Sequence, residues 1–274
     1  MSLKYDPAVV RTFYDSYGEK EWTRLVKDPA ARVSFHIHQH YLQKYVNSND
    51  SVLEVGAGAG RFTIELAKLN TSVTVGDISP EQLQLNQKYV TQHQCQGAIR
   101  SRLELDITDL SVFEPEAFDV AVCYGGALSY VLDRADVAIE QMLRVLKPKG
   151  YLLLSVMSVV GTTQAYFEAI TEIPDFTQLV YQVNRNGLLD KNRNNGHQLK
   201  MYRAKELREL LQSHNCEVVA MSASNCLSLN RNEFLESMVN TDSWSDFLNW
   251  ELDFCAEEGC LDSGTHLISV VKKF

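Results

Sequence analysis

The middle of the chain alternates between short apolar blocks and longer blocks of mixed polarity. The apolar blocks predict buried strands. The mixed blocks carry apolar residues three and four positions apart, which is the spacing of a helix packed on one face. Strands that alternate with helices predict a parallel α/β sheet, whose ligands bind at the carboxyl ends of the strands. The expected strands span 51–56, 71–77, 102–110, 118–126 and 150–157, and the expected helices between them span 61–69, 79–90 and 134–148.

The chain before the first strand has a helical pattern. Residues 6–22 predict one amphipathic helix, because Asp6 is a good N-cap, Pro7 suits the first helical position, and aromatic residues follow at helical spacing. A second helix is expected over 32–46. We therefore expect residues 1–47 to form an N-terminal helical cap.

The pattern beyond the fifth strand is less regular. The polar stretch 184–198 predicts an exposed loop or an irregular strand pair, and 232–259 predicts one or two helices. Residues 48–274 are expected to form the main α/β domain, with insertions at about 158–200 and 229–262. The remaining elements are one helix and two strands, at 204–212, 216–224 and 265–274.

Composition limits the classes of partner. A chain of 274 residues with 45% hydrophobic residues is long enough for one large core. The net charge of −9 disfavours a nucleic-acid partner, because phosphate contacts need a basic surface. No run of about 18 apolar residues predicts a membrane span, and the first residues do not resemble a signal peptide. We expect a cytoplasmic protein without membrane or nucleic-acid partners, and the sequence does not indicate its oligomeric state.

The stretch VLEVGAGAGRF, residues 52–62, places three glycines two residues apart where the first strand meets a helix. Glycines let the backbone approach a ligand closely, and the N–H groups of a helix start favour an anionic group. A tight turn with glycines for packing alone is the alternative. Two acids at later strand ends favour a ligand: Asp77 could accept hydrogen bonds from ribose hydroxyls, and Asp106 from an adenine amine. Their structural alternatives are a helix cap for Asp77 and a solvated strand end for Asp106.

Five stretches together resemble class I S-adenosylmethionine-dependent methyltransferases over about Val52 to Val156: LEVGAGAG, VGDIS, LDITDL, FDVAVCYGGALSYV and LRVLKPKGYLLLSV. The first has the pattern acid-x-Gly-x-Gly-x-Gly rather than the G-x-G-x-x-G of dinucleotide-binding folds. The resemblance implies a Rossmann-like, mostly parallel seven-stranded sheet with helices on both faces, in which 216–224 and 265–274 are the last two strands. It also implies S-adenosylmethionine as cofactor and S-adenosylhomocysteine as product.

The resemblance further implies how the methionine half of the cofactor is held. Gly56 and Gly58 are expected against the methionine, with Glu54 either supporting the loop or contacting the amino group. Cys123 and Tyr124, at the end of the fourth strand, are expected to flank the sulfonium.

On the adenosine side, the resemblance implies that Asp77 takes the ribose and Ile78 packs on the adenine. Asp106 and Ile107 are expected to frame the edge of the base. The full set of implied cofactor-binding residues is Glu54, Gly56, Ala57, Gly58, Gly60, Asp77, Ile78, Asp106, Ile107, Cys123 and Tyr124.

Methyl transfer from a sulfonium requires alignment and exclusion of water, and a general base only when the acceptor is protonated. Tyr17, Tyr124 and His38 are the candidates for a catalytic group. The sequence CYGG after the fourth strand replaces the Asn-Pro-Pro-Tyr motif of DNA and glutamine methyltransferases of this fold. With the acidic charge, it favours a small-molecule acceptor that enters between the N-terminal helices and the two insertions. Candidate pocket residues are Tyr14, Tyr17, Trp22, His38, Tyr124, Tyr130, His197 and Tyr202.

Structural alternatives exist for these residues. Helical spacing favours a core position for Tyr14 and Tyr17, and the polar surroundings of His197 favour a solvated side chain. In the stretch HIHQH, helical geometry separates His38 from the other two histidines, so we predict no metal site. Three other functions stay open: a nicotinamide-dependent oxidoreductase, a non-catalytic S-adenosylmethionine-binding scaffold, and a methyltransferase acting on a protein or RNA.

Overall fold

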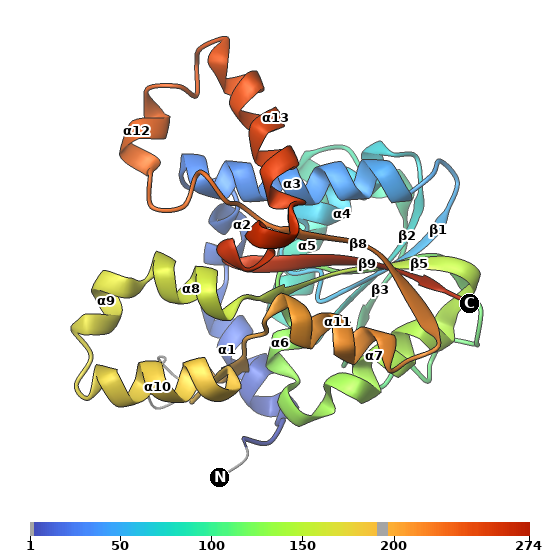
Figure 1. Ribbon diagram of the computed structural model, residues 1–274. Helices are drawn as coiled ribbons and strands as arrows, with labels where there is room; N and C mark the ends of the chain where they lie inside the picture. The colour runs from blue at the N-terminus through green and yellow to red at the C-terminus, as the bar shows by residue number, and fades with distance from the viewer. Residues whose placement is uncertain (1–2, 191–196) are drawn as a thin grey trace.

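A computed structural model describes residues 3–190 and 197–274 of the chain. The centre of the molecule is a seven-stranded sheet. The strand order is β3-β2-β1-β4-β5-β9-β8, and β9 runs antiparallel to both of its neighbours while the other pairs are parallel. This arrangement confirms the predicted fold class (Figure 1). The strands are β1 (Ser51–Val55), β2 (Ser72–Asp77), β3 (Ile99–Glu104), β4 (Phe118–Cys123), β5 (Leu146–Met157), β8 (Cys216–Ala223) and β9 (His266–Lys273).

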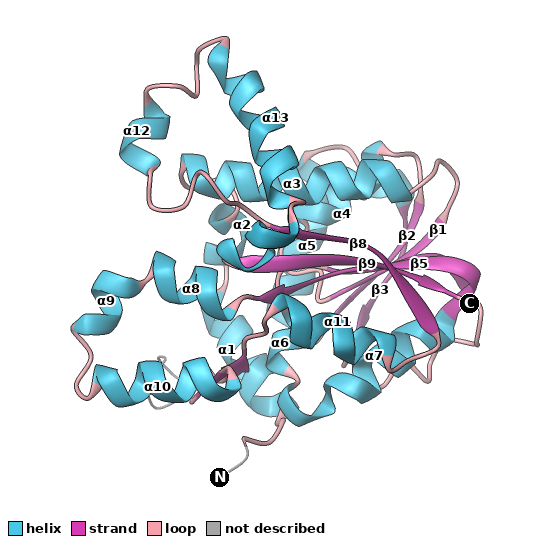
Figure 2. Cartoon of the chain, in the orientation of Figure 1, coloured by secondary structure: helices cyan, strands magenta, loops and turns pink. Residues whose placement is uncertain are grey.

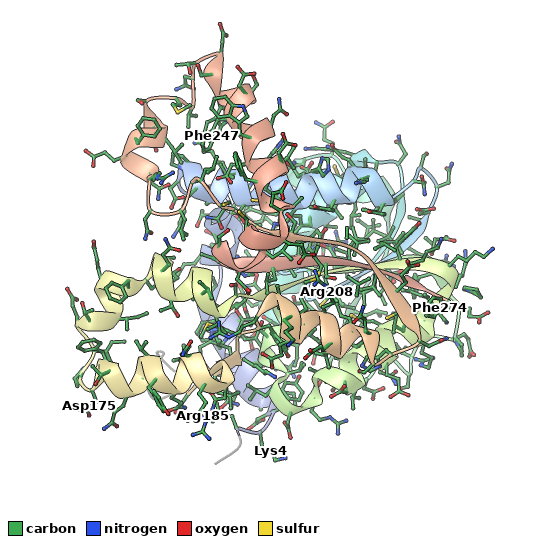
Figure 3. The ribbon with its side chains drawn as sticks, viewed as in Figure 1. Lys4, Asp175, Arg185, Arg208, Phe247 and Phe274 are labelled. Atoms are coloured by element: carbon green, nitrogen blue, oxygen red, sulfur yellow. The ribbon has the colours of Figure 1, made fainter. Side chains whose placement is uncertain are left out.

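Helices cover both faces of the sheet (Figure 2). Alternate side chains of a strand point to opposite faces, so Val52 and Leu53 of β1 enter different hydrophobic cores. Figure 3 shows Phe247 on α13 above α3, where its ring is buried in the core that contains Val52. The helices of that face are α3 (Pro29–Tyr45), α4 (Arg61–Lys68), α5 (Pro80–Gln92) and α13 (Ser243–Cys255), and those of the other face are α6 (Ala127–Tyr130), α7 (Ala135–Val145) and α11 (Ala204–Gln212).

The N-terminal segment contains one more helix than expected. The single helix expected over 6–22 is wrong, because α1 (Pro7–Tyr17) stops at Gly18 and α2 (Lys20–Arg24) follows. Gly18 has φ 53°, a conformation that glycine adopts readily and other residues avoid, so it turns the chain between the helices. The next helix, α3, begins at Pro29 rather than residue 32, because Asp28 accepts the N–H of Ala31 as N-cap.

Two strands have different bounds from those expected. β3 ends at Glu104, so Asp106 lies in the loop beyond the strand, where its carboxylate accepts the N–H of Thr108. The helix expected over 134–148 ends earlier than predicted, because α7 ends at Val145 and Pro148 lies inside β5. A proline is tolerated there because the pairing of β9 with β5 begins only at Tyr151, so no ladder bond from residue 148 to β9 is required.

Two insertions lie at one end of the sheet, as separate groups of helices on the left of Figure 1. One or two helices are predicted over 232–259, and the structure has two, α12 (Asn232–Glu236) and α13. Of the loop or strand pair predicted over 184–198, the structure has one short strand, β6 (Leu188–Leu189), whose partner β7 (Leu199–Lys200) lies just beyond that stretch, and residues 191–196 lie outside the described part. Three helices before this pair were not predicted: α8 (Val159–Ala165), α9 (Phe167–Thr171) and α10 (Phe176–Asn186).

The division into a cap of residues 1–47 and a domain of residues 48–274 remains a prediction. Across the described ranges, 3–190 and 197–274, no helix is both long and apolar enough to cross a membrane.

Candidate functional site

The glycine turn connects β1 to α4. Gly56, Gly58 and Gly60 all have positive φ angles, of 63°, 54° and 96°. A Cβ added to Gly56 would lie 2.6 Å from the Cβ of Ala127, so this position has no room for a side chain. The three glycines are therefore required by the backbone conformation, and they leave the turn bare at the carboxyl ends of the strands.

Glu54 supports this turn from behind. It is buried in β1, and its Oε2 accepts a hydrogen bond of 2.5 Å from the hydroxyl of Thr63 in α4. Asn86 of α5 donates to the same hydroxyl oxygen at 2.8 Å. Burial raises the pKa of Glu54 to about 8, although the bond from Thr63 acts in the opposite direction. Of the two roles left open for Glu54, these contacts favour support of the loop.

Asp77 joins the turn to the start of α5. Its Oδ2 accepts the N–H of Gly58 at 2.8 Å, and its Oδ1 accepts the N–H of Ser79 at 2.9 Å. Burial raises the pKa of Asp77 to about 6, and the two N–H groups act against that rise. Ser79 is itself the N-cap, accepting the N–H of Gln82, so Asp77 supports the helix start as well as the glycine turn.

A cavity of about 60 Å³, here called the inner cavity, opens beside the turn. It lies at the carboxyl ends of the strands, and α1 forms part of its wall through Val10 and Tyr14. Several of the predicted cofactor-binding residues line it: Gly56, Gly58, Asp77, Ile78, Ile107 and Tyr124. The others pack around it instead. Cys123 is fully buried in the hydrophobic core, which leaves its thiol no access to a ligand.

Asp106 lies at the rim of the inner cavity. Its Oδ2 accepts the hydroxyl of Tyr5 at 2.9 Å, and Tyr5 lines the cavity. Burial, and next the nearby carboxylate of Asp106, raise the pKa of Tyr5 well above its usual range. Asp106 is therefore a partly buried, hydrogen-bonded group rather than a solvated strand end.

Two residues of the site, Glu21 and Arg24 on α2, were missed by sequence reasoning. They form a salt bridge of 2.6 Å, and Glu21 lies so close to Gly58 that a Cβ there would be 3.1 Å from its Cγ. A Cβ on Gly125 would lie 3.3 Å from Nη2 of Arg24. Burial tends to lower the pKa of Arg24, but Glu21 outweighs it and the pKa is raised. Glu21 lies in the helix predicted over 6–22 and Arg24 just beyond its end, so their i, i+3 spacing was the available signal.

A second cavity of about 350 Å³, here called the outer cavity, lies next to the inner one. Side chains from α1, α2, α3, α8 and the segment before α12 line it. Two predicted pocket residues lie elsewhere: Trp22 stacks on Tyr89, and Tyr202 is fully buried in the core. The predicted pocket residues that do line the outer cavity are Tyr14, Tyr17, His38, Tyr130 and His197.

The two cavities share part of their walls. Tyr14, Glu21, Gly125 and Tyr130 line both of them. Tyr14 and Tyr130 pack edge to face, with ring centroids 5.6 Å apart. A ligand in the inner cavity and a second ligand in the outer cavity would therefore meet at this shared wall.

The expectation that His197 is solvated is wrong. Its side chain is 8% exposed and stacks between Phe13, at 3.7 Å between ring centroids, and Tyr130, at 4.3 Å. Burial lowers the pKa of His197 to about 4, so the ring is neutral at pH 7. The polar residues around His197 in the sequence gave no sign of these contacts, because Phe13 belongs to the N-terminal helix α1.

Comparison with known proteins adds a sequence relationship. Residues 52–150 match the family described as methyltransferase domain. The chain is 26% identical over 151 residues to the mitochondrial ubiquinone biosynthesis O-methyltransferase of Schizosaccharomyces pombe, covering 55% of this chain and 52% of that protein. It is also 26% identical over 173 residues to EEF1A lysine methyltransferase 2 of Homo sapiens, covering 58% of this chain and 66% of that protein. The chain spans about half the length of most of the curated relatives it matches.

A solved structure shares the fold over the full chain. The Burkholderia thailandensis 1,6-didemethyltoxoflavin-N1-methyltransferase, with bound 1,6-didemethyltoxoflavin and S-adenosylhomocysteine, superimposes with a TM-score of 0.59. The identity is 17%, and 100% of this chain and 92% of that chain are covered. Residues 52–150 therefore match the methyltransferase domain family, and the whole chain shares its fold with this solved methyltransferase.

Proposed function

We propose that the chain transfers the methyl group of S-adenosylmethionine to a small-molecule acceptor held in the outer cavity. The observation that carries this proposal is the wall shared by the two cavities, formed by Tyr14, Glu21, Gly125 and Tyr130. Direct displacement needs donor and acceptor side by side in a fixed orientation, and adjoining cavities supply that arrangement.

The chemical groups around the inner cavity fit the donor. Asp77 keeps acceptor capacity for ribose hydroxyls beside its two backbone partners, and Ile78 and Ile107 offer apolar surface to the adenine. Glu21, which lines the inner cavity, carries the charge opposite to the ammonium of the methionine end. When bound, the cofactor supplies a methyl group already activated on a sulfonium, so these residues bind and align it.

Donor binding also requires the inner cavity to widen. The inner cavity measures about 60 Å³, while small-molecule sites usually measure about 300 to 1,000 Å³. Tyr5, Val10 and Tyr14 line it, so a change in the conformation of these side chains enlarges the inner cavity while α1 keeps its place in the wall of the outer cavity.

The size of the outer cavity supports a small acceptor. Its volume of about 350 Å³ lies within the usual range of about 300 to 1,000 Å³ for small ligands. Two of the related proteins are named for small-molecule substrates or pathways, ubiquinone biosynthesis and 1,6-didemethyltoxoflavin. A third is named as a lysine methyltransferase, so a test must distinguish a small-molecule acceptor from a protein acceptor.

The test follows a radiolabelled methyl group from S-adenosylmethionine into an extract of the source cells, separated into small-molecule, protein, RNA and DNA fractions. The matched control is Gly58→Arg, which places a large side chain at a φ of 54° against Glu21. We expect label in the small-molecule fraction with the wild type and none above background with the variant. Label in a polymer fraction would overturn the small-molecule assignment.

Calorimetry separates the remaining alternatives. We expect S-adenosylhomocysteine to bind the wild type and NAD not to bind, because Asp77 and the glycine turn match the former ligand. Binding of NAD instead would favour an oxidoreductase. Binding of S-adenosylhomocysteine without any transfer of label would favour a non-catalytic scaffold.

A further inference from the structure

One residue that lines the outer cavity carries a buried nitrogen without a hydrogen-bond partner among residues 3–190 and 197–274. This atom is Nε2 of His38, on α3, whose side chain is 2% exposed. A buried polar atom left unpaired costs about 1 to 3 kcal/mol. A ligand that supplies the missing hydrogen bond would therefore gain affinity at this position.

The hydrogen bonding of the other ring nitrogen fixes what Nε2 can do. Nδ1 of His38 lies 2.7 Å from the carbonyl oxygen of Ser34, and because a carbonyl only accepts, Nδ1 carries the hydrogen. Burial, with a smaller contribution from Arg24, lowers the pKa of His38 to about 4, although the bond to Ser34 acts the other way. At pH 7 the ring is neutral, so Nε2 presents a lone pair and requires a donor.

His38 also lies close to the wall shared by the two cavities. Its ring packs edge to face on Tyr124, with centroids 4.7 Å apart, and Tyr124 lines the inner cavity. The next residue, Gly125, lines both cavities. A group bound to Nε2 would thus lie on the side of the outer cavity that faces the donor.

The charges around the outer cavity favour an uncharged acceptor. The charged side chains that line it, within the described part of the chain, form two ion pairs: Glu21 with Arg24, and Lys27 with Asp28. His266 also lines it, and burial, then the positive charge of Arg24, lower its pKa well below the usual value. A charged group entering this cavity would lose water without gaining an unpaired partner of opposite charge.

Aromatic rings form part of the wall of the outer cavity. Phe13 stacks on Tyr17 at 5.6 Å and on His197 at 3.7 Å between centroids. Tyr130 stacks on the other side of His197 at 4.3 Å. Because these rings cover one another's faces, they present mainly their edges to the cavity, and ring edges pack well on the face of an aromatic ligand.

We propose that the outer cavity binds an uncharged aromatic compound whose hydroxyl donates to Nε2 of His38, and that this hydroxyl is the methyl acceptor. The proposal rests on the proposed function. As the C–O bond forms and the S–C bond of the donor breaks with its electron pair left on sulfur, the hydroxyl proton passes to Nε2 of His38 and then to solvent. Methylation makes the oxygen far more acidic, so even a weakly basic imidazole accepts its proton.

The test uses 4-nitrophenol as probe and 4-nitroanisole, which lacks the O–H, as its comparison. Both are titrated by calorimetry at about pH 6 into protein saturated with S-adenosylhomocysteine. Loss of one buried hydrogen bond corresponds to about a tenfold change in affinity, so we expect the wild type to prefer the phenol by about that factor. No preference in the wild type would overturn the proposal.

Variants assign the preference to one residue. We expect His38→Leu to reduce the preference to about twofold or less, and His38→Gln, whose amide oxygen can accept, to retain more of it. The matched control is His40→Leu, on the same helix and not lining the outer cavity, which should keep the full preference. Loss of the preference in His197→Leu but not in His38→Leu would overturn the assignment.

Binding of S-adenosylhomocysteine is measured in every sample, so folded variants are recognised by unchanged cofactor affinity. Failure of the wild type to bind it would contradict the proposed function, while binding without a phenol preference would contradict only this inference. The ¹⁵N chemical shift of His38 in the wild type gives a check without mutation: Nε2 should show an unprotonated imidazole that becomes hydrogen-bonded when 4-nitrophenol is added.

Discussion

A single carboxylate, that of Asp77, connects the glycine turn, the start of α5 and the inner cavity. We expect Asp77→Ala to weaken binding of S-adenosylhomocysteine by about 1 to 3 kcal/mol, because ribose hydroxyls lose their acceptor and Gly58 loses its partner. The measurement is calorimetric titration of both proteins. Asp119→Ala is the control, because Asp119 accepts the N–H of Ser51 at the opposite end of the strands. Unchanged affinity in Asp77→Ala would mean that this carboxylate only supports the fold.

The buried carboxyl group of Glu54 makes stability depend on pH. Its pKa rises from 4.5 in the unfolded chain to about 8 in the folded protein, so between these values the folded state binds more protons and stability falls as pH rises. Glu54→Gln removes this titration. Relative to the wild type, we expect the variant to gain about 3 to 4 kcal/mol in unfolding free energy between pH 5 and pH 8.

Urea unfolding of both proteins across this pH range measures the effect of Glu54. The difference between the two curves cancels groups with shifted pKa values that do not interact with Glu54, such as His38. Glu65→Gln, on α4 and paired with Lys68, serves as control and should show no such difference. Parallel curves for Glu54→Gln and the wild type would contradict the prediction.

Residues whose role depends on local sequence could be predicted, and residues whose role depends on distant contacts could not. Asp77 and the three glycines follow from their positions next to strands, which the hydrophobic pattern locates. Glu21 and Arg24 reach the site only because Gly18 turns the chain after α1. The roles of the cofactor residues remain predictions until ligand binding is measured.

At the scale of elements, the turn between α1 and α2 controls how two walls of the site meet. Gly18 has φ 53° and ψ −134°, and a Cβ there would contact nothing within 4 Å. We expect Gly18→Ala to destabilise the protein by about 1 to 3 kcal/mol through backbone strain alone. Gly97→Ala is the matched control, since an added Cβ there is equally free and φ is not positive. Equal denaturation midpoints for the two variants would contradict this.

Each element that was predicted wrongly depends on something that apolar spacing does not show. The helix expected over 6–22 looked continuous because apolar spacing continues past Gly18, and only backbone geometry shows the break. The helices α8 and α9 were not predicted because they are short, of seven and five residues, and their stability comes from packing rather than from local propensity.

At the scale of the whole molecule, the sheet could be predicted and the cavities could not. A mostly parallel seven-stranded sheet follows from the pattern of alternating elements and from the resemblance over Val52 to Val156, whereas the strand order comes from the structure. The outer cavity depends on how the two insertions and the N-terminal helices pack on the sheet, and no local pattern encodes that packing.

The position of β9 has a consequence for how the chain folds during synthesis. β9 pairs with both β5 and β8, yet it follows both in the chain. On the ribosome, the edge of β5 therefore stays open and β8 has no neighbour until residues 266–273 emerge. Unpaired strand edges bind other chains readily, so the nascent protein is most exposed to misassembly just before this one strand inserts between its two partners.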